Sequence, residues 1–260
     1  MKNYLQLMEY ILSNGVEKTD RTGVGTYSVF GETLKYDLEK GFPIITTKKV
    51  SFNNIVSELL WFISGSTNIK WLHQYNNTIW DEWASDKGEL GKIYGSQWRS
   101  TGERNIDQLQ NVIEGIKKDP YSRRHIVNSW NVEDLNSMVL CPCHYTFQFV
   151  VENGKLNCIF NMRSVDVFLG LPYNISSYAL LTHIVSSLTD KIPGTLMWVG
   201  GDVHLYKNHI EQAKLQLERC PRKLPRLEMN FRGHINDFVV DDFTLVEYDP
   251  YPAIKAEVAV

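Results

Sequence analysis

Apolar residues recur every three or four positions in several parts of the chain, which predicts helices with one buried face. In residues 1–14 the apolar side chains share one helical face, and Asn14-Gly15 ends the helix. Ser51 is a suitable N-cap for a second helix, whose apolar face includes Phe52, Ile55, Leu59 and Phe62. Further helices are predicted over 106–117, over 174–189 and near 207–218.

Shorter apolar runs predict β-strands between these helices. They lie at 27–36, 43–47, 125–130, 145–151, 155–160, 196–199, 227–230 and 238–246. The runs 145–151 and 155–160 are joined by Glu152-Asn153-Gly154, and Asn-Gly is the strongest short-range signal of a hairpin, because both residues tolerate positive φ. The two runs are therefore predicted to pair as antiparallel strands.

This hairpin carries the first candidate chemistry. Cys143-His144 precedes its first strand, and Arg163-Ser164 follows its second. Antiparallel pairing would bring Cys143 beside Arg163, and a nearby guanidinium favours the thiolate, the form that attacks carbon. The pattern predicts a nucleophilic cysteine next to an anion pocket. Because consecutive strand residues face opposite ways, His144 is not expected to be the base for Cys143.

Other candidates lie outside the hairpin. Glu58, within the apolar run SELLWFISG, is expected to have a raised pKa and to move protons, although such glutamates often face solvent. The aromatic segments 79–83 and 94–99 could pack in the core or form a stacking wall for a flat heterocycle. The segment 20–26 could be a surface turn or a phosphate-binding loop with Arg21 as its fork.

Composition adds limits. The 260 residues are 43% hydrophobic and 22% charged, with a net charge of −3, so the chain has no bulk attraction for nucleic acid. No linker or repeat divides it, and one domain over 1–260 is predicted. There is no membrane-spanning apolar run and no signal-peptide pattern at the N-terminus. The four cysteines are too few for a disulfide scaffold, and together these features lead us to expect a cytoplasmic location.

The motifs extend almost from end to end and closely resemble those of the thymidylate synthase family. They include DRTGVGT, ELLWFISGSTN, IWDEW, YGSQWR, SRRHIV, PCH, RSVDVFLGLPYN, GGDVHLYKNH and the terminal YDPYPAIK. The resemblance implies an α/β (α+β) fold with a bent mixed β-sheet flanked by helices. It also implies a homodimer formed through one sheet face. The implied reaction is methylation of dUMP to dTMP, with 5,10-methylenetetrahydrofolate as carbon and hydride donor and no metal.

Carried over by position, the resemblance gives roles for individual residues. Cys143 would attack C6 of the pyrimidine, and Glu58 with Tyr94 would serve the proton network around C5. Asn174 would read the uracil amide edge. The phosphate would be held by Arg21, Arg163 and Ser164, and by Arg123 and Arg124 from the partner subunit; His204 and Tyr206 would bind the sugar hydroxyl. Asp166 would bind the pterin, and the folate would also contact Lys48, Ile79, Trp80, Trp83, Leu169, Tyr173 and Val260.

Several positions depart from the family pattern. Asn161-Met162 replaces the usual Tyr-Gln before Arg163, and the run Asn-Met-Arg-Ser resembles that of the phage deoxycytidylate hydroxymethylases, relatives that add water where the synthases transfer hydride. Leu140-Cys141-Pro142 precedes Cys143, and Tyr173 replaces a phenylalanine. Asn174 argues against a cytosine substrate, for which an aspartate would be expected. The alternative activity is therefore a deoxyuridylate hydroxymethylase, with a deoxycytidylate enzyme less favoured.

Three other interpretations of the same residues are weaker. Cys141 and Cys143 could begin a metal site, but Cys158 and Cys220 stand alone, whereas zinc usually takes a second closely spaced pair. A redox pair is similarly disfavoured. A non-catalytic nucleotide- or RNA-binding protein would have no need of the nucleophile, and the net charge gives RNA binding no support.

Overall fold

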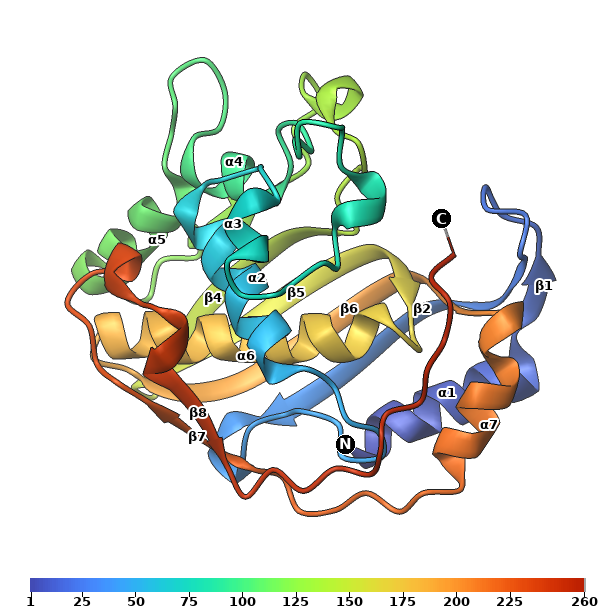
Figure 1. The fold of residues 1–260 in the computed structure, drawn as a ribbon. Coiled ribbons are helices and arrows are strands. Elements are labelled where there is room, and N and C mark those ends of the chain that lie inside the picture. The colour runs from blue at the N-terminus through green and yellow to red at the C-terminus, as the bar shows by residue number, and fades with distance from the viewer. Residues whose placement is uncertain (260) are drawn as a thin grey trace.

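The computed structural model describes residues 1–259 and is built on a six-stranded mixed sheet with the order β1-β2-β6-β5-β4-β3 (Figure 1). Neighbouring strands are antiparallel except β5 and β6, which are parallel. The strands are β1 (Val16–Lys18), β2 (Thr26–Asp37), β3 (Ile126–Asn128), β4 (His144–Glu152), β5 (Lys155–Asp166) and β6 (Ile192–Tyr206).

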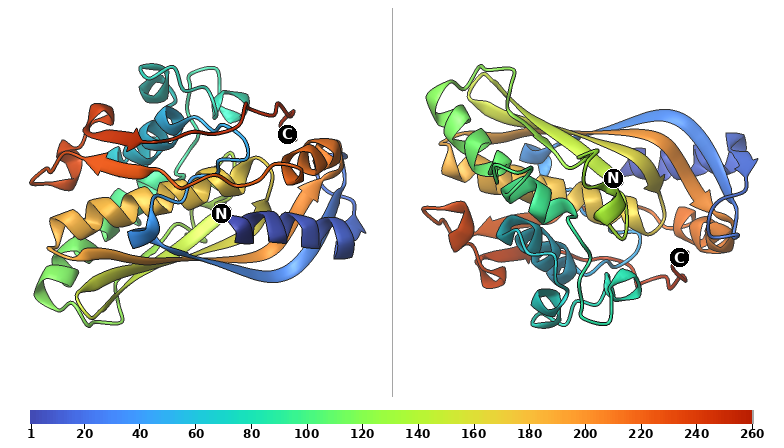
Figure 2. Two further views of the ribbon diagram at one scale, coloured as in Figure 1. Left: turned by 90° about the horizontal axis from the view of Figure 1, so that it is seen from below. Right: turned by 90° about the horizontal axis from the view of Figure 1, so that it is seen from above.

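Helices gather on one side of this sheet and leave its other face bare (Figure 2). A second, two-stranded sheet of β7 (Arg226–Met229) and β8 (Phe243–Val246) lies on the helical side. The helices are α1 (Lys2–Asn14), α2 (Phe52–Ser64), α3 (Lys70–His73), α4 (Tyr94–Arg99), α5 (Gln108–Lys118), α6 (Gly170–Leu188) and α7 (Ile210–Leu217). This agrees with the predicted bent mixed sheet flanked by helices. Within residues 1–259, no helix has the length and apolarity needed to cross a membrane.

The β4–β5 hairpin forms as the sequence predicts. Asn153 and Gly154 both have positive φ, 51° and 76°, as the tight turns that suit twisted strands require. At the other end of the hairpin, the Arg163 backbone N–H donates to the Cys143 carbonyl oxygen at 2.9 Å. The turn sets the register as far as the pair Thr146 and Asn161, and a shift between His144 and Thr146 then brings Cys143 beside Arg163.

Helix α6 is the centre of the core. Both its ends and its middle are buried, and Ala179, Leu180 and Ile184 have no exposed surface. It begins at Gly170, four residues before the predicted start, because Pro172 lies in the first turn, where a missing N–H costs no hydrogen bond. The Gly-Leu-Pro sequence starts the helix instead of separating it from β5.

The prediction of a strand over 43–47 is wrong. The segment is buried and belongs to no sheet. Its carbonyl groups accept hydrogen bonds from other elements, with Ser176 Oγ donating to Pro43 O and Tyr248 OH to Ile45 O, both at 3.0 Å. Its apolar character reflects burial under the helices, which a buried strand would share.

Strand β6 is much longer than the predicted 196–199. It runs for 15 residues through Gly194, Gly200 and Gly201, which interrupt the apolar pattern. A Cβ at Gly200 would lie 2.4 Å from the Trp198 ring, so that glycine allows the ring to pack against the strand. The predicted run 238–246 is also divided, since only Phe243–Val246 is a strand and short 3₁₀ turns precede it.

Candidate functional site

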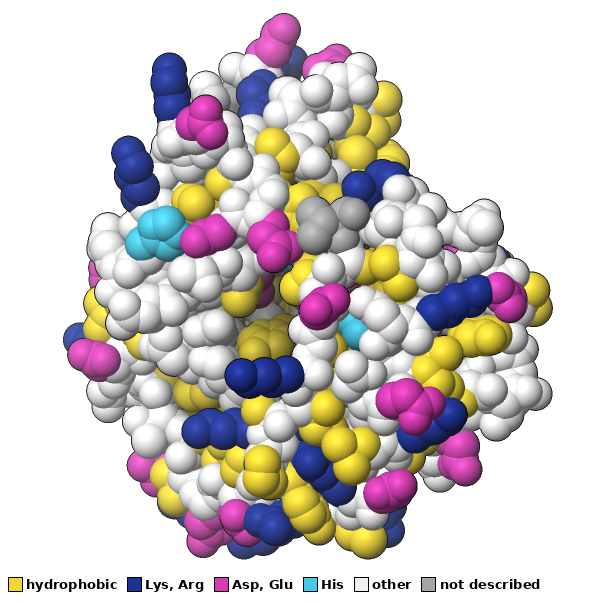
Figure 3. Space-filling view, turned by 45° about the vertical axis from the view of Figure 1, so that its right-hand side comes forward, with side chains coloured by type: hydrophobic (Ala, Val, Ile, Leu, Met, Phe, Trp, Pro, Cys, Tyr) yellow, Lys and Arg dark blue, Asp and Glu magenta, His cyan; other side chains and the backbone are white. Residues whose placement is uncertain are grey.

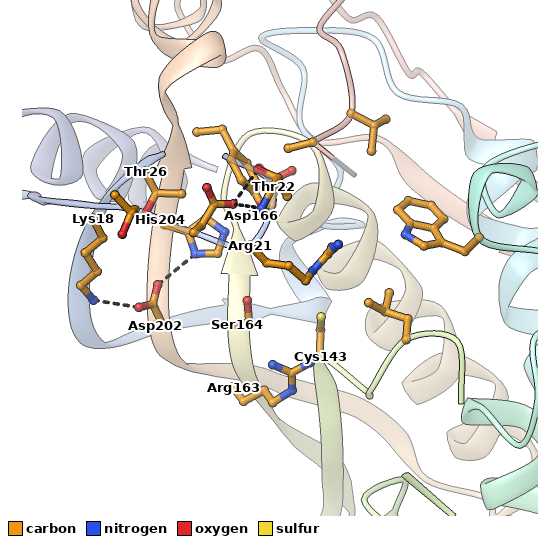
Figure 4. Close-up of a pocket in the computed structure, with 17 residues that line it drawn as sticks. Lys18, Arg21, Thr22, Thr26, Cys143, Arg163, Ser164, Asp166, Asp202 and His204 are labelled. Carbon is orange, nitrogen blue, oxygen red and sulfur yellow. Dashed lines mark hydrogen bonds and ion pairs between the residues drawn. The ribbon is translucent and has the colours of Figure 1, made fainter. Parts of the chain in front are cut away.

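A cavity of about 400 Å³ lies where β5 and β6 meet the loop before β2 and the C-terminal segment (Figure 4). Figure 3 shows this hollowed face, with basic, acidic and histidine side chains around apolar ones. The residues lining the cavity are Lys18, Thr19, Asp20, Arg21, Thr22, Thr26, Trp83, Leu140, Cys143, Arg163, Ser164, Asp166, Asp202, His204, Tyr206, Val258 and Ala259.

Cys143 and Arg163 face this cavity from the open end of the β4–β5 hairpin (Figure 4). The Arg163 guanidinium donates from Nε to Pro142 O at 2.9 Å and from one terminal nitrogen to Cys141 O at 2.8 Å. These bonds hold it against the segment that carries the thiol. The sequence thus predicts correctly that the two side chains meet.

The thiol itself is less acidic than an ordinary cysteine. Burial raises the pKa of Cys143, and the positive charge of Arg163 lowers it by a smaller amount. The predicted effect of the guanidinium is present, but desolvation outweighs it in the single ligand-free chain. Additional positive charge or hydrogen-bond donors near Sγ would therefore increase the thiolate fraction.

Tyr94 links the nucleophile to a buried aromatic group. Its hydroxyl accepts a hydrogen bond from the Cys143 backbone N–H at 2.8 Å, and its ring stacks on His144 at 4.0 Å. His144 is buried, and Nδ1 lies 2.9 Å from the Tyr178 hydroxyl. Burial lowers the pKa of His144 to about 3, which leaves it neutral. His144 is a core residue, as its place on the strand predicts.

Glu58 lies on α2 with only 8% of its surface exposed. Within residues 1–259 its one side-chain donor is Trp80, whose Nε1 lies 2.8 Å from Oε1. Burial raises the pKa of Glu58 to about 7, and the Trp80 hydrogen bond opposes this shift. The predicted raised pKa is confirmed. A carboxyl group with this pKa can both release and accept protons near neutral pH.

Asp166 and Asn174 both lie close to Gly170, where β5 passes into α6, but only Asp166 is among the residues that line the cavity. Asp166 Oδ1 accepts hydrogen bonds from the backbone N–H groups of Phe168 and Leu169 at 3.0 and 3.1 Å, and its side chain reaches the cavity (Figure 4). A Cβ built on Gly170 would be 3.8 Å from Asp166 Cβ and 3.7 Å from Asn174 Oδ1. Gly170 therefore lies between the two predicted site residues and leaves room for both.

The predicted phosphate- and sugar-binding residues fall into two groups. Arg21, Arg163, Ser164, His204 and Tyr206 all line the cavity, although they come from three separate segments. Arg123 and Arg124 are exposed beside β3 and do not line it within the single chain.

The aromatic residues predicted to contact a folate lie at the edge of the core. Trp83 lines the cavity, and its ring centroid is 5.8 Å from that of Trp80, which is buried. The half-buried side chains Ile79, Leu169 and Tyr173 also pack against the core. The Tyr173 hydroxyl accepts a hydrogen bond from the Ser51 N–H at 3.3 Å, so the additional hydroxyl has a partner.

Lys48 is turned away from the cavity. It is 4% exposed, and its ammonium donates to Phe168 O at 2.6 Å and lies 3.3 Å from the Phe168 ring centroid. Burial lowers the pKa of Lys48 to about 7, with Asp166 opposing the shift. The predicted contact with a folate tail is not formed in this conformation and stays a prediction.

The C-terminal segment, red in Figure 1, returns to the site, where Val258 and Ala259 line the cavity. His209, which is fully buried, holds this segment through Nε2, 2.7 Å from Glu257 O. Val260, predicted to contact the folate, lies outside the described residues.

Sequence reasoning missed several cavity residues, among them Lys18, Asp20 and Asp202. Asp202 is in the same motif as His204, so the strand alternation could have brought it to attention. Lys18 has no local signal, because it reaches the site through the pairing of β1 with β2 and of β2 with β6. Across residues 1–259, no three His, Cys, Asp or Glu side chains are grouped as metal ligands.

Comparison with known families agrees with this arrangement. A family model described as thymidylate synthase matches residues 2–260. The chain belongs to the thymidylate synthase family. This family comprises folate-dependent one-carbon transferases that bind dUMP and use methylenetetrahydrofolate as co-substrate. Methylation and hydroxymethylation both occur within it, so membership alone leaves the choice between them open.

Proposed function

We propose that the chain is a thymidylate synthase that converts dUMP to dTMP with 5,10-methylenetetrahydrofolate. The observation that carries the proposal is the common cavity of Cys143, Arg163, Arg21 and His204, which places a nucleophile next to groups that can hold a nucleotide. The runner-up is a deoxyuridylate hydroxymethylase with the same substrates.

Cys143 provides the covalent step. Its thiolate adds to C6 of the pyrimidine, and the electron pair of the C5–C6 double bond makes C5 a carbon nucleophile. After C5 has accepted the one-carbon unit, loss of the C5 proton allows the Sγ–C6 bond to break. A bound phosphate dianion needs the arginines as counter-charges, and these also favour the thiolate.

Glu58 and Asn174 both act on the pyrimidine base, Glu58 as a proton carrier and Asn174 as a reader of its amide edge. Glu58, with a pKa near 7, exchanges protons through ordered water or the C4 oxygen. The Asn174 amide donates to the uracil O4 and accepts from N3–H. An aspartate there would suit the C4 amine and N3 of cytosine, so Asn174 favours dUMP over dCMP.

The residues around the cavity fit a reduced folate. Trp83 provides flat apolar surface at the cavity with the buried Trp80 packed against it, and Asp166 has a carboxylate at the cavity that can accept from pterin N–H groups. The bound folate supplies the one-carbon unit and, in the synthase reaction, a hydride. The C-terminal segment, Trp80 and Trp83 exclude water from that chemistry.

The unusual Asn161-Met162 pair, the departure shared with hydroxymethylases, lies outside the lining of the catalytic cavity. Met162 is 4% exposed and lies among core side chains, and it is not one of the residues that line the catalytic cavity. Asn161 lies beside a different hollow, on the bare face of the sheet.

Product analysis tests the proposal. Purified protein is incubated with dUMP and methylenetetrahydrofolate, dihydrofolate is followed by absorbance, and the nucleotide is identified by mass. We expect dTMP and dihydrofolate in equal amounts. 5-Hydroxymethyl-dUMP with tetrahydrofolate would overturn the synthase assignment in favour of the hydroxymethylase.

The substrate choice has its own test. Asn174→Asp should move the ratio of kcat/KM from dUMP toward dCMP by about 100-fold or more, because the pyrimidine edge then meets reversed donors and acceptors. Asn161→Gln, in the neighbouring hollow, is the control and should leave the ratio unchanged. Unchanged selectivity in Asn174→Asp would contradict the edge-reading role.

We also propose that two chains form the complete enzyme through the bare face of the sheet. That face exposes Val150 and Phe30, and half-buried Ile159, Met197 and Val199 lie between them. A second copy would cover these apolar side chains and could bring its Arg123 and Arg124 to the phosphate. The chain is expected to act in the cytoplasm, without a nucleic-acid partner.

Mixing two inactive variants tests the shared site. One carries Cys143→Ala and the other carries both Arg123→Ala and Arg124→Ala. A hybrid dimer has one intact site, which takes Cys143 from one chain and the arginines from the other. Mixing and subunit exchange should restore activity; absence of recovery in a hybrid verified by mass would contradict cross-subunit arginines.

A further inference from the structure

Asp202, a residue without a role in the mechanism above, gathers three donors at the edge of the cavity. Its Oδ1 lies 2.9 Å from Ser28 Oγ and 3.0 Å from His204 Nδ1, and its Oδ2 lies 2.8 Å from Lys18 Nζ. The dashed lines in Figure 4 show the contacts with Lys18 and His204. All four residues lie on the paired strands β1, β2 and β6.

These contacts determine which nitrogen of His204 carries a proton. Hydrogen bonding from His204, with further donors on Lys18 and Ser28, lowers the pKa of Asp202 well below its usual range, so the group is an anion at neutral pH. An ionised carboxylate can only accept hydrogen bonds, so His204 Nδ1 must be the donor. In the neutral imidazole, Nε2 then carries a lone pair.

Nε2 is the ring nitrogen left for a ligand. His204 is 6% exposed and lines the cavity, and Nε2 makes no hydrogen bond with any of residues 1–259. The Tyr206 ring lies 5.1 Å from the imidazole, edge to face, and also lines the cavity. A lone pair at this place accepts from a hydroxyl group and repels other lone pairs.

We propose that Asp202 is a positioning residue that holds His204 with an Nε2 acceptor, so that the cavity selects a nucleotide whose sugar hydroxyl donates a proton. This inference rests on the proposed function. Its consequence is discrimination against nucleotides with a 3′-phosphate or a 3′-ether, which offer only acceptors. The acceptor oxygens of such nucleotides would face the Nε2 lone pair without a donor, which weakens their binding relative to that of a nucleotide with a free hydroxyl group.

Lys18 determines which way a side-chain amide at position 202 would be oriented. An ammonium has three donors and no acceptor, so Lys18, which also donates to Ser28 Oγ at 3.0 Å, can pair only with an oxygen of residue 202 and not with an N–H group. In Asp202→Asn, the amide oxygen is therefore expected to stay on Lys18, and its NH₂ group turns to His204. That group donates to Nδ1 and moves the imidazole proton to Nε2. The site would then offer a donor in place of an acceptor, as when an asparagine replaces the aspartate beside a catalytic histidine.

The experiment compares wild type, Asp202→Asn and the control Asp37→Asn. Asp37 is an exposed carboxylate paired with Lys40, outside the cavity. The His204 tautomer is read from ¹⁵N chemical shifts of the ligand-free protein, and steady-state kinetics with dUMP give KM and kcat. We expect a proton on Nδ1 in wild type and on Nε2 in Asp202→Asn, with a KM about 10-fold higher and kcat within a few-fold. Asp37→Asn should match wild type.

A double variant separates tautomer control from a general structural role. Adding Lys18→Met to Asp202→Asn removes the group that requires the amide oxygen, so the amide can turn and accept from Nδ1 again. The double variant should regain the Nδ1 proton and a lower KM than Asp202→Asn alone. A purely structural role predicts that the second substitution makes KM worse.

Other results would overturn the proposal. These are a wild-type His204 with a proton on Nε2, alone or together with Nδ1, or an unchanged tautomer and KM in Asp202→Asn. The NMR measurement does not depend on turnover. If wild type turns over no dUMP at all, the proposed function fails, while the tautomer assignment is still decided by the spectrum.

Discussion

Two carboxylates, Glu58 and Asp202, show how the protein gives one functional group different properties in two environments. Glu58 is buried in an apolar wall with one hydrogen-bond donor, and burial raises its pKa to about 7. Asp202 is half-exposed and has three donors, which lower its pKa below the usual range. The number of donors and the degree of burial decide which carboxyl group can exchange protons near neutral pH.

The largest expected effect comes from removing the reacting group itself. Cys143→Ala should reduce turnover by about 10⁴-fold or more, because no other described cavity residue is a thiol. dUMP binding, measured by calorimetry, should persist, since the carboxylates and arginines remain. Turnover near that of wild type would contradict the covalent mechanism.

The next prediction separates the two carboxylates by kinetics. Glu58→Gln removes a proton carrier but keeps an oxygen for Trp80, so kcat should fall by roughly 10²–10⁴-fold with little change in KM. Asp202→Asn should show the opposite pattern, with a raised KM and a nearly unchanged kcat. The comparison fails if both variants change the same kinetic constant.

A third prediction concerns stability. The raised pKa of Glu58 means that its carboxyl group holds the proton more tightly in the folded protein than in the unfolded chain. The protonated carboxyl group therefore stabilises the fold fully below about pH 4.5, and this contribution is lost as the pH rises through about 7. Glu58→Gln never ionises. The free energy of unfolding of the variant, relative to that of wild type, should therefore rise by about 3 kcal/mol between pH 4.5 and pH 7. Denaturant melts at several pH values measure this gain, and a pH-independent difference would contradict it.

The smallest effect tests the balance at Cys143. Arg163 lowers the thiol pKa while burial raises it, so Arg163→Met should raise that pKa further. Alkylation by iodoacetamide at neutral pH should slow several-fold, and the midpoint of its pH dependence should move upward. Arg222→Met, which removes an arginine of the C-terminal ion pair with Asp249, is the matched control. Equal or faster alkylation of Arg163→Met would show that the guanidinium does not stabilise the thiolate.

The elements that sequence predicts best are those with a strong local cause. Asn153-Gly154 determines the hairpin turn, and the apolar run around Glu58 is enough to predict both its helix and its raised pKa. Ser51 likewise caps α2 as expected, with its Oγ accepting from Asn54 N–H at 3.2 Å. In each case the relevant neighbours are close in the chain.

The features that sequence missed depend on distant neighbours. The segment 43–47 resembles a strand because it is buried, and only the fold reveals that no strand lies beside it. Lys18 and Asp202 are 184 residues apart and meet through strand pairing. The direction of the pKa shift of Cys143 could not be predicted from sequence either, because it depends on how deeply the fold buries the thiol.

A pH titration of both carboxyl groups by ¹³C NMR, on ligand-free protein with labelled Asp and Glu, tests the division between them most directly. The Glu58 carboxyl carbon should titrate with a midpoint near 7, and the Asp202 carbon should remain in its ionised position as pH falls to 3.8, its ordinary pKa. A Glu58 midpoint near 4.5, or an Asp202 midpoint at or above 3.8, would contradict the account.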